Sequence, residues 1–206
     1  MSRLCVMTAN ARAYYILVSR LRRAGMEFVS AMPDSDCSGC EVVLTTKEEV
    51  GSFGCPALAV EDLDDDPGVF KGQVLSKLSG GNDVLLVGID PGKRIGLAAF
   101  YGKARLMVGT FQSVSAVCSE VARFSTNVPR SSFVVRVGNG DMQMVRKMSW
   151  VLRQAVPAVV VEVVNEAGTS TRTARMRGVQ GDEGAAAEIA FRRGKAVEGH
   201  EARIAS

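Results

Sequence analysis

The sequence contains no run of the roughly 18 apolar residues that a membrane-spanning helix needs, although 47% of its residues are hydrophobic. The beginning of the chain also lacks the charged, apolar and small-residue segments of a signal peptide. A chain of 206 residues with this hydrophobic content can bury the core of one large domain or of two small ones. We therefore expect a cytoplasmic protein with no membrane partner.

The chain has a small net charge and a single histidine. The formal net charge is +3, which permits a polyanionic partner without requiring one. The single histidine, His200, lies in the terminal segment. A metal site made of histidines is therefore not expected.

Cysteine is present but scattered. The five cysteines are an odd number and make poor material for a secreted disulfide framework. Cys37-Ser-Gly-Cys40 has the spacing of a zinc ribbon, but a structural zinc site needs four ligands. We expect reduced surface thiols, with metal binding by Cys37 and Cys40 as the alternative.

The first 80 residues alternate short apolar stretches with segments of helical spacing, which predicts a small α/β domain with a parallel sheet. Its role is not indicated by these patterns. Pro67 is well placed to open the second helix, and residues 79–83 have the composition of a linker. The predicted strands cover 4–8, 28–32, 42–44 and 57–60, and the predicted helices cover 11–24 and 67–78.

Residues 84–206 follow a different order, β-β-β-α-β-α-β-α, and are predicted to form a second domain. Short loops between the first three strands predict an antiparallel meander. Right-handed crossovers would then place the fourth and fifth strands parallel to the first. The predicted strands cover 84–90, 96–100, 105–111, 133–137 and 158–164, and the helices cover 114–124, 141–154 and 182–193.

Acidic residues follow several of these elements. Asp90 ends a strand that is apolar on both faces, where a carboxylate is costly unless a cation, hydrogen bonds or water compensate it. Parallel strands place their carboxyl ends on one edge of a sheet, where α/β proteins bind ligands. Oxygen ligands at this edge suit Mg²⁺ or Mn²⁺. The acids expected there are Asp90, Glu166, Asp182 and Glu183, beside the loop Gly138-Asn139-Gly140-Asp141.

Each acid also has a simpler interpretation. Asp90 precedes Pro-Gly and is compatible with a turn residue. Asp182 is compatible with a helix N-cap, and Glu166 with an acid in a surface loop. We favour the metal site because one fold would bring all three together.

Three motifs then resemble a known family. They are GIDPGKRIGLA at 88–98, NEAGTS at 165–170 and GDEGAAAEIA at 181–190. In this order they are similar to the RNase H-like superfamily in its RuvC/YqgF branch, which includes Holliday-junction resolvases and pre-ribosomal-RNA nucleases. The resemblance covers residues 84–194 and implies an RNase H-like mixed sheet. It also implies a metal-dependent phosphodiesterase acting on structured nucleic acid, an endonuclease rather than an exonuclease.

The resemblance implies roles for particular residues. Asp90, Glu166 and Asp182 would be catalytic metal ligands, with Glu183 beside them and Mg²⁺ or Mn²⁺ as the cofactor. A homodimer is expected by analogy with resolvases. Cations near the acids would contact phosphates, although a solvated basic loop is the simpler alternative; they are Lys93, Arg94, Arg172, Arg175 and Arg177.

Other positions depart from the family pattern and support an alternative. Asn165 replaces the first acid of an Asp-Glu pair, Ala185 replaces a second aspartate of the last helix, and strand 133–137 has no glutamate. These departures favour a non-catalytic nucleic-acid-binding protein with the same fold. A phosphotransferase of the actin, Hsp70 and sugar-kinase type is a third interpretation, but it needs two such domains. Trp150, among apolar neighbours, is predicted to be core rather than a base-stacking residue.

Overall fold

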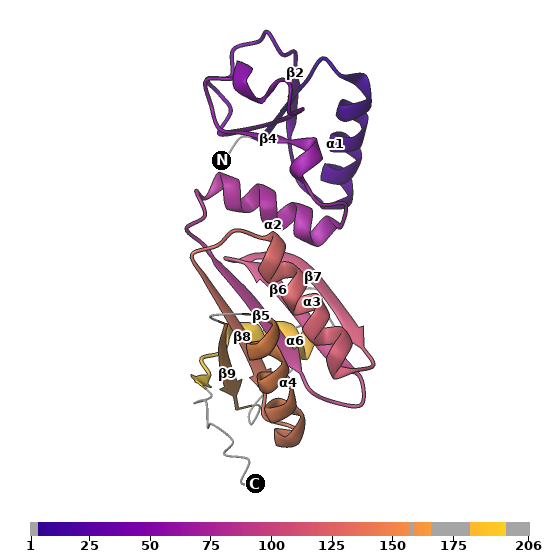
Figure 1. The fold of residues 1–206 in the computed structure, drawn as a ribbon, viewed down its shortest axis with the longest axis vertical. Helices are drawn as coiled ribbons and strands as arrows, with labels where there is room; N and C mark the ends of the chain where they lie inside the picture. Colours follow the sequence, from indigo (N-terminus) through magenta and orange to yellow (C-terminus); the bar gives the residue numbers. More distant parts are fainter. Residues whose placement is uncertain (1–3, 157–158, 166–181, 197–206) are drawn as a thin grey trace. The chain divides into compact units, whose positions relative to one another are not determined.

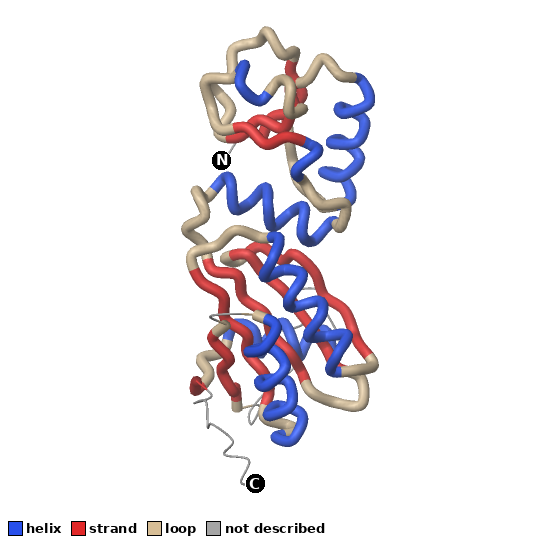
Figure 2. The backbone as a smooth tube through the Cα atoms, in the orientation of Figure 1, coloured by secondary structure: helices blue, strands red, loops and turns tan. Residues whose placement is uncertain are grey.

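The computed structural model describes residues 4–156, 159–165 and 182–196 (Figure 1). The chain is α/β, with a four-stranded parallel sheet, a six-stranded mixed sheet and five α-helices among the described residues (Figure 2). It divides into two compact units. The first comprises Met1–Val84, Tyr101–Leu106 and Phe124–Ser132, and the second comprises Leu85–Phe100, Met107–Arg123 and Phe133–Ser206. The domains predicted at 1–80 and 84–206 stay a prediction.

The four-stranded sheet has the order β2-β1-β3-β4. Its paired strands are all parallel, which confirms the prediction for this part of the chain. The central strand β1 aligns Cys5 with Val29 of β2 and with Val43 of β3. The strands are β1 (Leu4–Met7), β2 (Val29–Ala31), β3 (Val42–Thr45) and β4 (Ala57–Ala59).

Two capped helices accompany this sheet. Helix α1 (Ala11–Arg23) begins after Asn10, whose side chain accepts a hydrogen bond of 3.0 Å from the Ala13 N–H. Helix α2 (Pro67–Leu78) begins after Asp66, which accepts hydrogen bonds from the first turn. Such caps satisfy amide groups that have no partner inside the helix. Proline therefore opens α2 as predicted.

The two faces of this sheet are covered differently. Side chains alternate between faces along a strand, so Leu4 and Val6 lie on the face opposite to Cys5 and Met7. Leu4 and Val6 belong to a core with buried residues of α1 and α2, including Leu17 and Phe70. On the other face, Cys5, Met7 and Val43 form a separate cluster. Its further partners are half-buried residues outside the two helices: Ala31, Cys37, Cys40, Phe53, Cys55 and Ala57.

The six-stranded sheet has the order β10-β9-β8-β5-β6-β7. The first three strands of this sheet along the chain, β5, β6 and β7, are neighbours, in agreement with the predicted meander. Strand β10 is antiparallel to β9 and was not predicted, because two residues give no apolar period. The strands are β5 (Val84–Asp90), β6 (Ile95–Tyr101), β7 (Ala104–Phe111), β8 (Ser132–Gly138), β9 (Val160–Val164) and β10 (Lys195–Ala196).

Three helices accompany the six-stranded sheet: α3 (Val114–Asn127), α4 (Met142–Ala155) and α6 (Asp182–Phe191). In Figure 1, α3 and α4 lie in front of the strands, and α6 lies behind them. Helix α6 packs through Ala186, Ala187 and Ala190 against Leu86 of β5 and Ala98 of β6. These small side chains let the helix approach the sheet closely. The predicted closing helix was too long by two residues, because Arg192 and Arg193 lead into β10.

Candidate active site

Asp90 is the last residue of β5 and is half-buried. Leu86 packs in the cluster that contains α6, and Gly88 faces the same helix directly. Because side chains alternate along a strand, Asp90 lies on this face as well. The carboxylate therefore belongs to the α6 side of the sheet.

The strands beside Asp90 end at the same edge. The Ser131 N–H donates a hydrogen bond of 3.1 Å to the Asp83 carbonyl oxygen, so the neighbouring strands β5 and β8 begin together and run in the same direction. Strands β8 and β9 are parallel, with Gly138 opposite Val164. The carboxyl end of β5 therefore shares an edge with those of β8 and β9, the arrangement in which α/β sheets bind ligands.

Helix α6 is fixed against β5 at a glycine. An ideal Cβ on Gly88 would lie 2.0 Å from the Ala186 carbonyl oxygen and 2.6 Å from the Ala190 nitrogen. From this contact, Asp182 is about 6 Å back along the helix axis, and Asp90 is about 7 Å along the strand. The helix that begins with Asp182 thus packs on the strand that ends with Asp90.

The remaining acids are only partly described. Glu166 lies outside the described residues, as does the side chain of Asp182, while Glu183 is half-buried on α6. Within the described part of the chain, no group of three or more His, Cys, Asp or Glu side chains is placed to hold a metal ion. The proposed ligand set of Asp90, Glu166, Asp182 and Glu183 stays a prediction.

The loop after β8 has a structural explanation. The Asn139 N–H donates a hydrogen bond of 3.0 Å to the Val164 carbonyl oxygen and so extends the pairing with β9. Asn139 and Gly140 are exposed. Asp141 caps α4, because its carboxylate accepts a hydrogen bond of 2.9 Å from the Met144 N–H. The loop reaches the expected edge, but the described contact of the Asp141 carboxylate is a helix cap.

Two of the predicted phosphate-contact residues are described. Lys93 and Arg94 are exposed in the loop between β5 and β6. Arg94 donates a hydrogen bond of 2.8 Å from Nη2 to Oγ1 of Thr110 on β7. Val108 packs in the α6 cluster, so alternation puts Thr110 on the face of Asp90. Arg172, Arg175 and Arg177 lie outside the described residues.

An ion pair on the same face escaped the sequence analysis. Arg136 on β8 and Glu162 on β9 stand opposite each other, with 2.7 Å between Nε and Oε2. Arg136 also donates a hydrogen bond of 2.7 Å to the Ala190 carbonyl oxygen. The pair therefore links two strands to α6. The available signal was one charge of each sign inside otherwise apolar strands, where an unpaired charge is costly.

The prediction that Trp150 belongs to the core is wrong, since 67% of its surface is exposed. Helix α4 buries Val145, Met148 and Leu152, and residue 150 is rotated by about 200° from residue 148 in a helix of 3.6 residues per turn. Arg146 and Lys147 are exposed one turn before Trp150. The outer face of α4 thus combines an aromatic ring with cations.

The carboxyl edge of the four-stranded sheet holds a carboxylate of its own. Glu49 accepts hydrogen bonds from the Oγ1 atoms of Thr8, Thr45 (2.7 Å) and Thr46 (2.8 Å), and from the Ala9 N–H (2.7 Å). Burial raises the pKa of Glu49, but these four hydrogen bonds outweigh it and lower the pKa to about 2. The site lies between the ends of β1 and β3, where the strand order reverses and α/β sheets open a ligand crevice.

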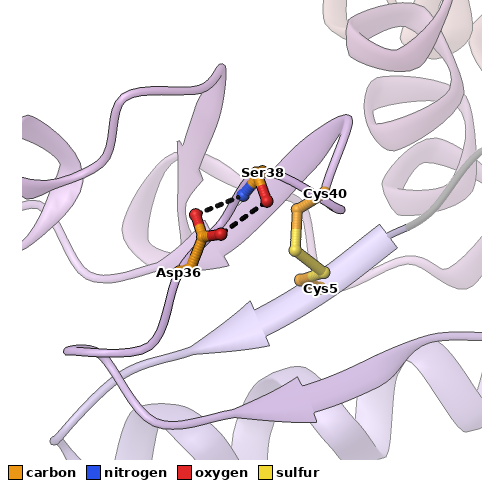
Figure 3. Close-up of a disulfide and its surroundings, with 4 residues drawn as sticks. All are labelled: Cys5, Asp36, Ser38 and Cys40. Carbon is orange, nitrogen blue, oxygen red and sulfur yellow. Dashed lines mark hydrogen bonds between the residues drawn. A yellow bond between two sulfur atoms is a disulfide. The ribbon is translucent and has the colours of Figure 1, made fainter.

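The expectation of reduced surface thiols is wrong for three cysteines, because Cys118 is free but buried and two others are paired. Cys5 and Cys40 form a disulfide with 5.9 Å between their Cα atoms (Figure 3), and Cys5 is almost fully buried. The segment before Cys40 is shaped locally, because the Asp36 carboxylate accepts hydrogen bonds from the Ser38 N–H (2.8 Å) and Oγ (2.6 Å). Sequence spacing could not show that this segment folds over β1.

Comparisons with protein-family models and with curated proteins find no match to this chain. Among the described residues, no helix combines the length and the apolar composition that crossing a membrane requires.

Proposed function

We propose that the chain is a metal-dependent phosphodiesterase, an endonuclease acting on structured nucleic acid. The observation that carries the proposal is the placement of Asp90. Its carboxylate ends the interior strand β5, on the sheet face covered by a helix whose own first residues are Asp182 and Glu183. The resemblance of residues 84–194 to the RuvC/YqgF branch supports the same function.

The residues present fit a hard divalent cation. Asp90 and Glu183 are oxygen donors, and the single histidine of the chain is far along the sequence at His200. Such ligands suit Mg²⁺ or Mn²⁺ rather than zinc. The proposed set is Asp90, Glu166, Asp182 and Glu183. When bound, one or two divalent cations activate water and stabilise the leaving oxygen in phosphodiester hydrolysis.

The protein's own cations would orient the substrate. Arg94 is anchored by Thr110 on the face of Asp90, and Lys93 is exposed beside it. Both can contact phosphates that flank the scissile bond. Arg172, Arg175 and Arg177 are proposed to add contacts from the segment before α6. Together they would hold the nucleic-acid backbone beside Asp90.

The outer face of α4 supports nucleic acid as the substrate class. Arg146 and Lys147 can neutralise phosphates, and the exposed Trp150 offers a surface on which a base can stack. Helix α4 also begins directly after Asp141, on the edge where β5, β8 and β9 end. A nucleic-acid strand that passes over this edge from one face of the sheet to the other could therefore contact both Asp90 and α4.

One observation favours a non-catalytic nucleic-acid-binding protein instead. Resolvases of this branch carry a glutamate on the fourth strand, whereas the one charged residue of β8 is the ion-paired Arg136. Asn165 and Ala185 depart from the pattern in the same direction. This alternative keeps the same binding surface and omits cleavage.

Cleavage of a substrate panel separates the two. The panel contains a Holliday junction, a flap, a plain duplex, single-stranded RNA and precursor ribosomal RNA, each with Mg²⁺, with Mn²⁺ or with a chelator. Metal-dependent cleavage of a structured member supports the enzyme. Binding without cleavage supports the alternative, and a chain that neither binds nor cleaves any member contradicts both.

A further inference from the structure

Four of the five cysteines gather on one face of the four-stranded sheet. Cys5 lies in the buried cluster with Met7 and Val43, and Cys37, Cys40 and Cys55 pack against it. They come from three separate places: strand β1, the segment before β3 and the segment before β4. The fifth, Cys118, is buried in α3 and belongs to the second unit.

The four cysteines comprise one disulfide and two free thiols. Cys5 and Cys40 share the disulfide, while Cys37 and Cys55 are free thiols and half-buried. All four belong to the same small cluster with Met7 and Val43.

The sheet face that carries Cys5 is covered by segments other than α1 and α2. Parallel sheets are normally covered by helices on both faces, but α1 and α2 contribute to the core of the opposite face only. Here the partners of Cys5 and Met7 come from outside the helices and include few large apolar side chains, with Phe53 the largest. Sulfur ligation is a means of fixing such segments when hydrophobic burial is small.

We propose that Cys5, Cys37, Cys40 and Cys55 form a structural Zn²⁺ site when the Cys5–Cys40 disulfide is reduced. Zinc prefers four thiolate or imidazole ligands in a closed tetrahedron, and soft thiolates select it over Mg²⁺. Cys37-Ser-Gly-Cys40 has the two-residue spacing of zinc ligand pairs, and its turn is closed by a 2.8 Å hydrogen bond from the Cys40 N–H to the Cys37 carbonyl oxygen. In the disulfide form only Cys37 and Cys55 remain as thiols here, so the described residues hold no group of three or more metal ligands until Cys5 and Cys40 are reduced.

The disulfide is reduced first. Two molecules of a thiol reductant each give one electron and one proton to the disulfide, which yields the thiols of Cys5 and Cys40, and the reductant leaves as its own disulfide. Zn²⁺ would then replace the four thiol protons, which pass to solvent. The site would carry a net charge of about −2 from four thiolates and one dication.

The experiment uses the full chain, reduced with a phosphine because thiol reductants bind zinc themselves. After removal of excess metal, bound zinc is measured by mass spectrometry, and protected cysteines are counted by alkylation. We expect one zinc per chain, with the half-buried Cys37, Cys40 and Cys55 protected from alkylation only while zinc is present. Replacement by Co²⁺ should give the absorption of tetrahedral thiolate coordination.

Three variants sharpen the test. Cys37→Ser and Cys55→Ser leave the Cys5–Cys40 disulfide intact, so their folding is verified by circular dichroism before reduction. Each should weaken zinc binding by more than about 100-fold, because loss of a direct ligand exceeds the 10- to 100-fold effect of an outer-shell partner. Cys118→Ala should bind zinc as wild type does.

Several results would overturn the proposal. They are a reduced and folded chain that takes up no zinc, a Co²⁺ spectrum of octahedral oxygen coordination, and Cys37→Ser or Cys55→Ser binding as tightly as wild type. A reduced chain that unfolds and is not restored by zinc would overturn it as well. None of these outcomes bears on cleavage at Asp90.

Discussion

The carbonyl oxygen of Ala186 occupies the space where a side chain on Gly88 would begin, 2.0 Å from the ideal Cβ position. The obstacle is helix backbone, which cannot rotate away as a side chain could. We predict that Gly88→Ala forces α6 off β5 and lowers the free energy of unfolding by about 3 kcal/mol or more. Urea denaturation followed by circular dichroism measures this loss.

Gly109→Ala on β7 is the matched control. Its Cβ would meet Met107 Cε at 3.4 Å and Phe111 at 3.7 Å, which are ordinary contacts. Glycine is intrinsically poor in a strand, so this variant should be neutral or stabilised by up to about 1 kcal/mol. Equal stabilities for the two variants would contradict the close packing of α6 on β5.

Glu49 predicts an acid-dependent loss of stability. Its pKa is lowered from 4.5 to about 2 in the folded chain, so the ionised form contributes stability above the unfolded pKa. That contribution falls as the pH drops from about 4.5 towards 2 and amounts to at most about 3 kcal/mol. Glu49→Gln should lose it at neutral pH and show a flatter dependence of the urea midpoint on pH.

The neighbouring exposed Glu48 provides the comparison. Glu48→Gln changes the same charge in the same turn without touching the hydroxyl groups of Thr8, Thr45 and Thr46. Its urea midpoints between pH 2 and 7 should follow those of wild type. If Glu49→Gln follows them as well, the hydrogen bonds at this edge contribute nothing to stability.

The sequence was sufficient where local patterns decide structure. Apolar stretches located β1, β3 and β5–β9 to within a few residues, and Pro67 marked the start of α2. The parallel first sheet followed from alternating strands and helices. Asp90 at the end of β5 needed only the end of an apolar run.

Features that depend on distant pairing could not be predicted. The Cys5–Cys40 disulfide and the hydrogen bonds that Glu49 accepts from Thr8 and Ala9 join segments more than 30 residues apart. The Arg136–Glu162 pair requires the register of β8 on β9. Trp150 was misplaced because its apolar neighbours in sequence point to the other side of the helix. The disulfide, the Glu49 hydrogen bonds to Thr8 and Ala9 and the ion pair are set by topology rather than by spacing, whereas the exposure of Trp150 follows from the helical spacing of Val145, Met148 and Leu152.

We predict that breaking the half-buried Arg136–Glu162 ion pair lowers stability more than breaking an exposed ion pair does. Both side chains are only about one fifth exposed, at 18% and 20%, so Arg136→Ala leaves Glu162 poorly solvated and should cost about 2 kcal/mol or more. Lys47→Ala breaks a far more exposed pair with Asp62, whose side chains are 60% and 58% exposed, and should change the stability much less. Urea unfolding of both variants measures the difference.

A double variant tests whether charge or packing is responsible. Arg136→Met together with Glu162→Leu removes both charges and keeps apolar volume, so it should be more stable than Arg136→Ala. If the double variant is instead less stable than Arg136→Ala, the ion pair contributes more to the free energy of unfolding than the cancelling of two half-buried charges.

Trp150 predicts a base-stacking contact on α4. Trp150→Ala should weaken nucleic-acid binding by about 5- to 100-fold, the range for one stacked base, and leave the salt dependence unchanged. Arg146→Ala should reduce the salt slope by about one. Fluorescence anisotropy across a salt series, with Ca²⁺ in place of Mg²⁺, measures both.

Tyr15→Ala is the matched control for Trp150. Tyr15 is 73% exposed on α1 in the first unit, so its loss removes an exposed aromatic ring that does not belong to the proposed surface. Binding by this variant should equal that of wild type. If Trp150→Ala also equals wild type, the outer face of α4 is not part of the binding surface.

Asp90→Asn tests whether Asp90 is a catalytic metal ligand, with the rate of Mn²⁺-dependent cleavage as the measurement. The variant removes one charge and nearly preserves the shape of the side chain, so it should lower cleavage to the background level. Its free energy of unfolding and its nucleic-acid affinity, measured by fluorescence anisotropy, should equal those of wild type. Asp141→Asn is the control at the same edge, because asparagine caps a helix as well as aspartate does, and it should cleave normally. Wild-type cleavage by Asp90→Asn would contradict the proposed active site.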